Sequence, residues 1–93
     1  MPISLFTEVG IFAWKGVSIM PMIDMTATGE NIKNLIAENG MKVKDVAKVF
    51  GFASAYPVYK WINGTTLPAL ENLVVLAKTL NVTMDEIIIV TTA

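Results

Sequence analysis

The 93-residue sequence contains no cysteine and no histidine. The lack of cysteine removes disulfides, thiolate zinc sites and cysteine nucleophiles, and it suits a reducing compartment. The lack of histidine removes the usual general base and the commonest transition-metal ligand. Most familiar active-site arrangements are therefore excluded, and we expect an all-protein domain with neither a metal site nor a cofactor.

Arginine is also missing, so all seven basic residues are lysines, and eight acidic residues bring the net charge to −1 at pH 7. The chain is therefore not uniformly basic, and any attraction to phosphate has to come from a local patch. No stretch reaches the roughly 18 consecutive apolar residues of a membrane span. No basic segment precedes the apolar N-terminal residues, as it would in a signal peptide. We expect a cytoplasmic protein that does not bind membranes.

Apolar residues make up 54% of the chain, enough for one buried core, and composition divides the sequence near residue 25. Residues 1–25 show no helical periodicity, and their β-type residues predict an N-terminal extension that is non-helical or contains a short strand or hairpin. An alternative is that this extension is not native. Lys15-Gly16-Val17 can be encoded by a purine-rich run like a bacterial ribosome-binding site, which would start translation at Met20 or Met22. The intact mass of the protein from its host decides between these two interpretations.

Residues 26–93 contain the start and stop signals of five short helices, which predicts an all-α domain. Each expected helix has a recognisable start or stop signal. Thr28 caps the first helix, which ends at Asn39-Gly40, and Gly51 ends a second helix over 43–50. Ser54 caps a third helix, which ends at Asn63-Gly64, and Asn81 ends a fourth helix, whose apolar residues run from Leu70 to Leu80. The capping box Thr83-Met84-Asp85-Glu86 starts a fifth helix, which runs to about Val90.

The third expected helix has two chemically distinct faces. With Val58, Trp61 and Ile62 inward, a rotation of 100° per residue places four polar or aromatic side chains together on the opposite side: Tyr56, Tyr59, Lys60 and Asn63. This face contains no carboxylate. Between Met41 and Pro68 four lysines stand against one acid, Asp45, so a local charge of +3 sits in an acidic chain. Such a separation is typical of a nucleic-acid-binding surface, although an ordinary solvated helix face is the alternative.

The order of these residues resembles the Cro/CI-type (lambda repressor-like, XRE) helix-turn-helix family. The resemblance covers roughly Thr26 to Val90 and rests on one ordered set: Val46-Ala47, Gly51, Ser54, Val58, Trp61, Asn63-Gly64, Pro68, Leu73, Ala77, Leu80 and Val82-Thr83-Met84-Asp85-Glu86-Ile87. It implies a five-helix DNA-binding domain that acts as a dimer, with the third helix in the major groove of double-stranded DNA.

Carried onto this sequence, the resemblance implies two sets of contacts. The base-contacting set is Ala55, Tyr56, Tyr59 and Lys60, and the phosphate-contacting set is Lys42, Lys44, Lys48, Ser54, Asn63, Gly64 and Thr65. Ser54 is equally well explained as a plain helix cap, and Lys44 as a solvated lysine. Trp61 is better explained as a core residue, because its spacing from Val58 and Ile62 points it inward.

The sequence departs from the family pattern at three points. The turn is one residue longer than usual between Gly51 and Trp61, as in a subgroup with a Gly-Phe-x-Ser turn. Val43 stands where a phosphate-binding glutamine often opens the second helix. Without arginine, bidentate Arg–guanine contacts are missing, so only Lys60 can address guanine strongly. We therefore expect modest affinity per subunit.

Low affinity per subunit calls for dimerisation, and the apolar run Ile87-Ile88-Ile89-Val90 offers a surface for it, although it could instead complete the core. A DNA-binding regulator, most simply a repressor, is the leading interpretation. The alternative is a protein-interaction module of the same fold, such as an antitoxin that holds a protein partner. An enzyme is disfavoured, because Asp85 and Glu86 are adjacent at a helix start, where they serve the cap and the helix dipole.

Overall fold

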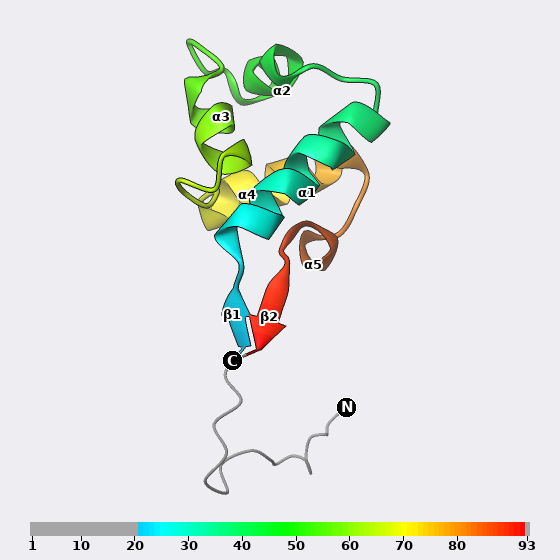
Figure 1. Ribbon diagram of the computed structural model, residues 1–93. Helices are drawn as coiled ribbons and strands as arrows, with labels where there is room; N and C mark the ends of the chain where they lie inside the picture. The colour runs from blue at the N-terminus through cyan, green and yellow to red at the C-terminus, as the bar shows by residue number, and fades with distance from the viewer. Residues whose placement is uncertain (1–20, 93) are drawn as a thin grey trace, which may run out of the picture.

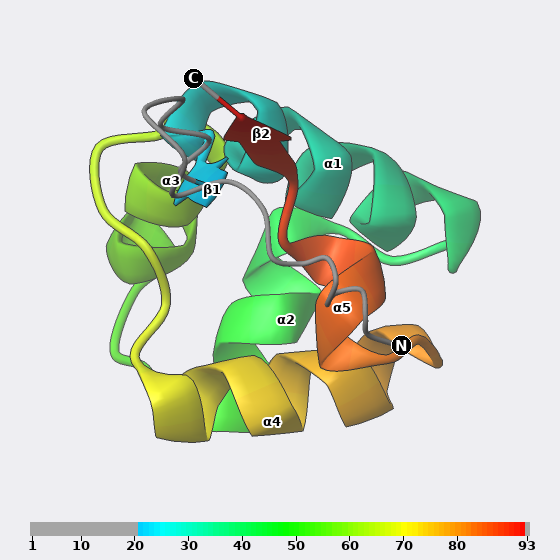
Figure 2. The same ribbon diagram turned by 90° about the horizontal axis from the view of Figure 1, so that it is seen from below.

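The computed structural model describes residues 21–92, which form five short helices and one two-stranded ribbon (Figure 1). In chain order the elements are β1 (Pro21–Ile23), α1 (Met25–Glu38), α2 (Val43–Phe50), α3 (Tyr56–Ile62), α4 (Leu70–Leu80), α5 (Met84–Ile87) and β2 (Val90–Thr92). In the view of Figure 2, α2 and α5 lie between α1 and α4, and α3 lies to one side. The prediction of an all-α domain with five helices is confirmed.

Most helix ends are set by the residues that the sequence indicates. Gly51 and Asn81 end α2 and α4 in the left-handed conformation, with φ of 74° and 60°. This conformation suits glycine and asparagine because larger side chains clash in it. The capping box is present at α5, where the Thr83 hydroxyl accepts from the Glu86 N–H at 3.2 Å and the Glu86 carboxylate accepts from the Thr83 N–H at 2.8 Å.

The start of α1 differs from the sequence prediction. The cap is Asp24, whose carboxylate accepts from the Ala27 N–H at 2.9 Å, and the helix begins at Met25. Thr28 lies inside the helix and is 1% exposed. Its hydroxyl accepts from the Ile89 N–H at 2.9 Å, so this residue holds the C-terminal segment rather than the helix end. Thr28 was therefore wrongly predicted as a cap.

The C-terminal segment also differs from its prediction, because α5 ends at Ile87 and the chain continues as β2. β2 pairs antiparallel with β1, with Pro21 opposite Thr92, Met22 opposite Thr91 and Ile23 opposite Val90. Residues 21–25, which composition alone assigns to the extension, are thus part of the folded unit. The β-type residues that predicted a strand or hairpin lie in residues 5–14, outside the described residues, and the alternative start of translation at Met20 or Met22 stays a prediction.

The core gathers side chains from all five helices. Ile32 of α1, Val46 of α2, Val58 of α3, Leu76 of α4 and Ile87 of α5 are all fully buried. Each such side chain contributes about 1.5–3 kcal/mol through burial. On α4 the inward residues are Leu73, Leu76, Ala77 and Leu80, whereas Leu70 is 73% exposed. Among residues 21–92, no helix has both the length and the apolar content needed to cross a membrane.

Candidate nucleic-acid interface

The interface is built on the α2–turn–α3 unit, and three aromatic rings hold this unit together. Phe50 at the end of α2 stacks on Phe52 in the turn, with ring centroids 5.1 Å apart. Trp61 of α3 meets both rings edge-on, at 5.4 Å from Phe50 and 6.0 Å from Phe52. Such contacts fix the angle between two short helices. Trp61 is 5% exposed, which confirms it as a core residue.

Phe52 was predicted only as a turn residue, and its contribution to this cluster was missed. The sequence does contain a signal for this contribution, because Phe50 and Phe52 flank Gly51, the residue that ends α2. The Phe52 N–H donates to the Ala47 carbonyl at 3.0 Å, which folds the chain back over the end of α2 and places the ring against Trp61. Phe52 therefore positions α3 without lying on its exposed face.

Gly29 of α1 supports α3 from behind and was also missed. A Cβ at this position would lie 2.5 Å from the Trp61 carbonyl oxygen and closer still to that of Ile62. Only glycine lets the α1 backbone come this close to the end of α3. Helix periodicity places Gly29 on the inner face of α1, but it gives no sign of which helix approaches it.

The four predicted residues of the outer face of α3 do lie together on the surface. Tyr56 is 67% exposed and Tyr59 49% exposed, Asn63 is exposed and Lys60 is half-buried. The Lys60 Nζ lies 5.5 Å from the centroid of the Tyr56 ring, which is within the range of a cation–π contact. This contact restrains the only cation of α3 near the middle of the exposed face.

The beginning of α3 lies one residue later than predicted, because the predicted N-cap residue was Ser54. Ala55 is the N-cap residue and Tyr56 the first helical residue. Ser54 precedes the cap, and its hydroxyl accepts from the Tyr56 N–H at 3.3 Å. Ser54 therefore helps to start the helix while it stays exposed. Ala55 is half-buried and packs against the core, so only part of its surface is open to a ligand.

The residues predicted to contact phosphate are placed in two groups. Lys42, Lys44 and Lys48 are exposed on and next to α2. After α3, the Gly64 N–H donates to the Trp61 carbonyl at 3.1 Å and the Thr65 N–H to the Lys60 carbonyl at 2.9 Å. These two backbone groups close the end of α3, so they do not point at a phosphate, contrary to the expectation for the loop backbone. The exposed side chains of Asn63 and Thr65 are the groups that remain open there.

The one acid of the basic segment is held at the start of α2. The Asp45 carboxylate accepts from the Lys42 N–H at 2.9 Å, and Asp45 lies in the first turn of the helix. A carboxylate there is favourable because it meets the positive end of the helix dipole. The Asp45 carboxylate therefore interacts with the N-terminal end of α2, and the exposed lysines make the charge of the surrounding surface positive.

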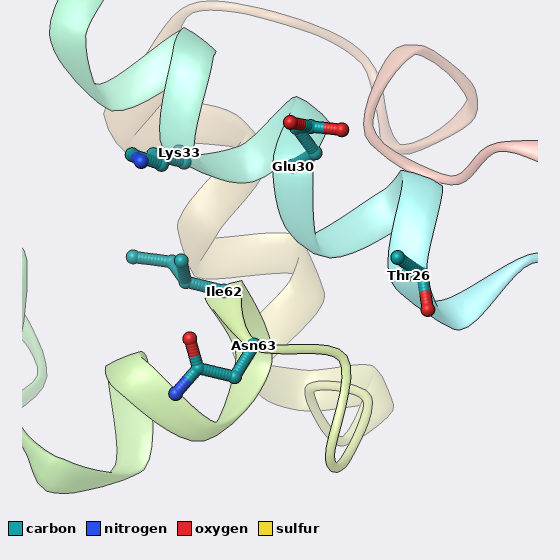
Figure 3. Close-up of a pocket in the computed structure, with 5 residues that line it drawn as sticks. All are labelled: Thr26, Glu30, Lys33, Ile62 and Asn63. Carbon is teal, nitrogen blue, oxygen red and sulfur yellow. The ribbon is translucent and has the colours of Figure 1, made fainter.

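An open cleft of about 200 Å³ lies between α1 and the end of α3 (Figure 3). It is lined by Thr26, Glu30 and Lys33 of α1, by Ile62 of α3 and by Asn63, the C-cap residue that follows α3. Lys33 was not predicted as a site residue, because it lies outside the basic segment between Met41 and Pro68. The cleft carries one cation and one carboxylate, so it has no net charge that would favour an anion.

Comparison with known proteins agrees with this geometry. A family model for the Cro/C1-type HTH DNA-binding domain matches residues 31–93. The structure is similar to that of the P22 c2 repressor protein in complex with a synthetic operator, with 27% identity and a TM-score of 0.60 over 64% of this chain and 89% of that one.

It is also similar in fold to the restriction-modification controller protein C.AhdI from Aeromonas hydrophila, with 22% identity and a TM-score of 0.62 over 69% of this chain and 96% of that one. No curated protein matches the sequence. The family model covers more than half of the chain and spans α2, the turn and α3. The chain belongs to the Cro/C1-type helix-turn-helix family of DNA-binding domains.

Proposed function

We propose that the protein is a sequence-specific transcriptional repressor of the cytoplasm that inserts α3 into the major groove of double-stranded DNA as a homodimer. The observation that carries this proposal is the exposed face of α3, which presents two phenols, one cation and one amide and no carboxylate. The aromatic cluster and Gly29 hold that face rigidly. The operator-bound P22 c2 repressor, which has a similar structure, supports DNA as the partner.

Base recognition falls to a short list of groups. Lys60 donates to the O6 and N7 acceptors of guanine, the commonest target of a basic side chain in the major groove. Tyr56 and Tyr59 offer hydroxyls to base edges, with their rings flanking the lysine. A good contact of this kind discriminates between bases by about 1–3 kcal/mol. One such lysine per subunit gives modest specificity, which two half-sites would double.

Phosphate contacts supply the rest of the affinity. Lys42, Lys44 and Lys48 are exposed on and next to α2, and we assign them to contacts with the DNA backbone. About three contacts per subunit give about six per dimer, which corresponds to a slope of log K against log salt near −5. Since a single subunit would contribute only half of this, we infer that two copies bind together.

Selection of bound DNA from a random pool, run at two salt concentrations, tests the proposal directly. A palindromic consensus and a steep loss of binding at the higher salt are expected. The matched variants are the double substitution Tyr56→Ala with Lys60→Ala, and Lys78→Ala, which removes an exposed lysine from α4. The double variant should lose specific binding by about 100-fold or more, and Lys78→Ala should bind as the parent does.

Thermal denaturation separates loss of contact from loss of fold. Tyr56 is 67% exposed, and exposed substitutions change stability by about 0.5 kcal/mol or less. The melting temperature of the double variant should therefore stay close to that of the parent. Unchanged operator binding by this variant would contradict the proposal.

A second function of the same fold, as an antitoxin-like module that holds a protein partner, is favoured by apolar side chains outside the core. Leu70 of α4 is 73% exposed and Val49 of α2 52% exposed, and Val74 and Val75 of α4 are close to 40% exposed. Co-purification of a stoichiometric partner from the host, lost on Leu70→Lys, would support this function. Neither proposal includes catalysis, since Glu86 is engaged in the α5 cap.

A further inference from the structure

The β1–β2 ribbon exposes apolar side chains and carries no charge. Met22 is 56% exposed, Ile23 45% and Val90 53%. No charged residue occurs in either strand. A two-stranded ribbon alone is marginally stable in water, and further strands or a packed face are needed to stabilise it. The composition of the ribbon therefore suits the addition of another strand to it.

The hydrogen-bond pattern shows which backbone groups point outward. The Asp24 N–H donates to the Ile89 carbonyl at 2.8 Å, and these two residues stand opposite each other one step beyond the paired strands. Because bonded and non-bonded pairs alternate in an antiparallel ladder, Met22 and Thr91 form the next bonded pair. The backbone groups of Pro21, Ile23, Val90 and Thr92 therefore point away from the ribbon. Within residues 21–92, no third strand pairs with them.

The two outer edges are not equivalent. The edge of β1 contains Pro21, which has no N–H, and a proline on an edge blocks pairing. The edge of β2 presents the N–H and C=O groups of Val90 and Thr92. These groups match a second β2 strand running the other way, with Val90 opposite Thr92 of the other copy and the two Thr91 residues facing each other on a two-fold axis.

We propose that β2 pairs antiparallel with β2 of a second copy, so that a four-stranded sheet in the order β1–β2–β2–β1 joins the dimer. This rests on the proposed function, which calls for two copies on one operator. Pairing brings no like charges together, since both strands are uncharged. The ribbon projects from the helices at the end opposite α2, so this contact leaves the outer face of α3 uncovered (Figure 1).

This surface replaces the one expected from the apolar run. Ile87 is fully buried in its own domain and Ile88 is partly buried against the same core, whereas Ile89 is 36% exposed. Val90 keeps a dimer role, but through the edge of a strand rather than a helix face. A three-residue edge buries less than the roughly 800 Å² per partner of a standard interface. The dimer should therefore be weak and depend on concentration.

The absence of cysteine from the chain gives a clean test, because a single introduced cysteine can form a disulfide only between two copies. Thr91→Cys places the thiols at the proposed axis, where the Cα atoms of a non-bonded pair are about 4.5 Å apart, within disulfide range. Met22→Cys is the matched control, since Met22 is the partner of Thr91 in the ribbon. Across four strands the two Met22 positions would be about 14 Å apart, too far for a disulfide.

Each full-length variant is oxidised without DNA and run on a non-reducing gel. The expected result is a disulfide-linked dimer for Thr91→Cys and a monomer for Met22→Cys. The reverse pattern would overturn the proposal in favour of a dimer through β1. Monomers for both variants would also overturn it.

Val90→Pro provides a second measurement. It removes an outward N–H and leaves the Met22–Thr91 bonds intact, so sedimentation should show a monomer where the parent is a dimer, with little change in melting temperature. A Val90→Pro dimer would overturn the proposal, and if this variant does not fold, the cysteine pair decides. Cross-linking without operator binding would refute only the proposed function. Operator binding without cross-linking would refute only this interface.

Discussion

Substitution of Gly29 by alanine tests how α1 sets the position of α3. The added Cβ would lie 2.5 Å from the Trp61 carbonyl oxygen, whereas ordinary contacts begin at 3.4 Å, so the helices must separate by about 1 Å. Overpacking of this kind costs about 1–3 kcal/mol. The atoms that the added Cβ would meet belong to the backbone and not to a flexible side chain. The destabilisation should therefore lie at the upper end of this range. Alanine recovers about 1 kcal/mol of helix propensity, which leaves a net loss near 2 kcal/mol.

For a domain of this size, 1 kcal/mol corresponds to a change of about 4–8 °C in melting temperature, so Gly29→Ala should melt about 8–16 °C lower. Circular dichroism against temperature and urea measures this, and operator affinity measured well below the melting point should fall as well, because α3 shifts. Asn34→Ala, exposed on the same helix, is the control and should gain up to about 0.7 kcal/mol. If Gly29→Ala were as stable as the parent, the close approach of α1 and α3 would not constrain the fold.

Three further substitutions probe the contacts that hold the site and the C-terminal segment. Phe52→Ala removes a ring from the aromatic cluster and should cost about 2–4 kcal/mol in urea denaturation; a loss below about 0.5 kcal/mol would argue against its positioning role. Thr28→Val leaves the Ile89 N–H without its 2.9 Å acceptor and should cost about 1–3 kcal/mol, while Thr28→Ser should retain most of the stability. Asn31→Ala removes the donor to two carbonyls at the end of α5, at 2.7 and 2.9 Å; faster hydrogen exchange in that segment is expected, and unchanged exchange would show that the contact is dispensable.

The sequence predicts the site well where the signal is local. The outer face of α3 follows from the helical period, because three inward apolar residues determine where the remaining side chains point. The buried position of Trp61 follows for the same reason. The helix stops at Gly51 and Asn81 are equally local, since each depends on the backbone conformation of a single residue.

The sequence does not predict which segments that are distant along the chain contact each other. Gly29 is an ordinary residue of an amphipathic helix until the end of α3 lies against it. Thr28 matches a helix-cap pattern, yet its hydroxyl bonds to Ile89, 61 residues away. Phe52 looks like part of a turn until Trp61 meets its ring. A residue's own neighbours in the chain carry no information on which of these partners it will meet.

The sequence by itself determined the helices, their order and the composition of the face that we propose to read DNA, because periodicity and capping act over a few residues. Only the tertiary structure decided the conformation and burial of the apolar run Ile87-Ile88-Ile89-Val90. Ile87 is taken into the core, and Val90 to Thr92 form a strand instead of extending α5. A strand is stabilised by its pairing partner, and that partner is Pro21–Ile23, at the opposite end of the described chain.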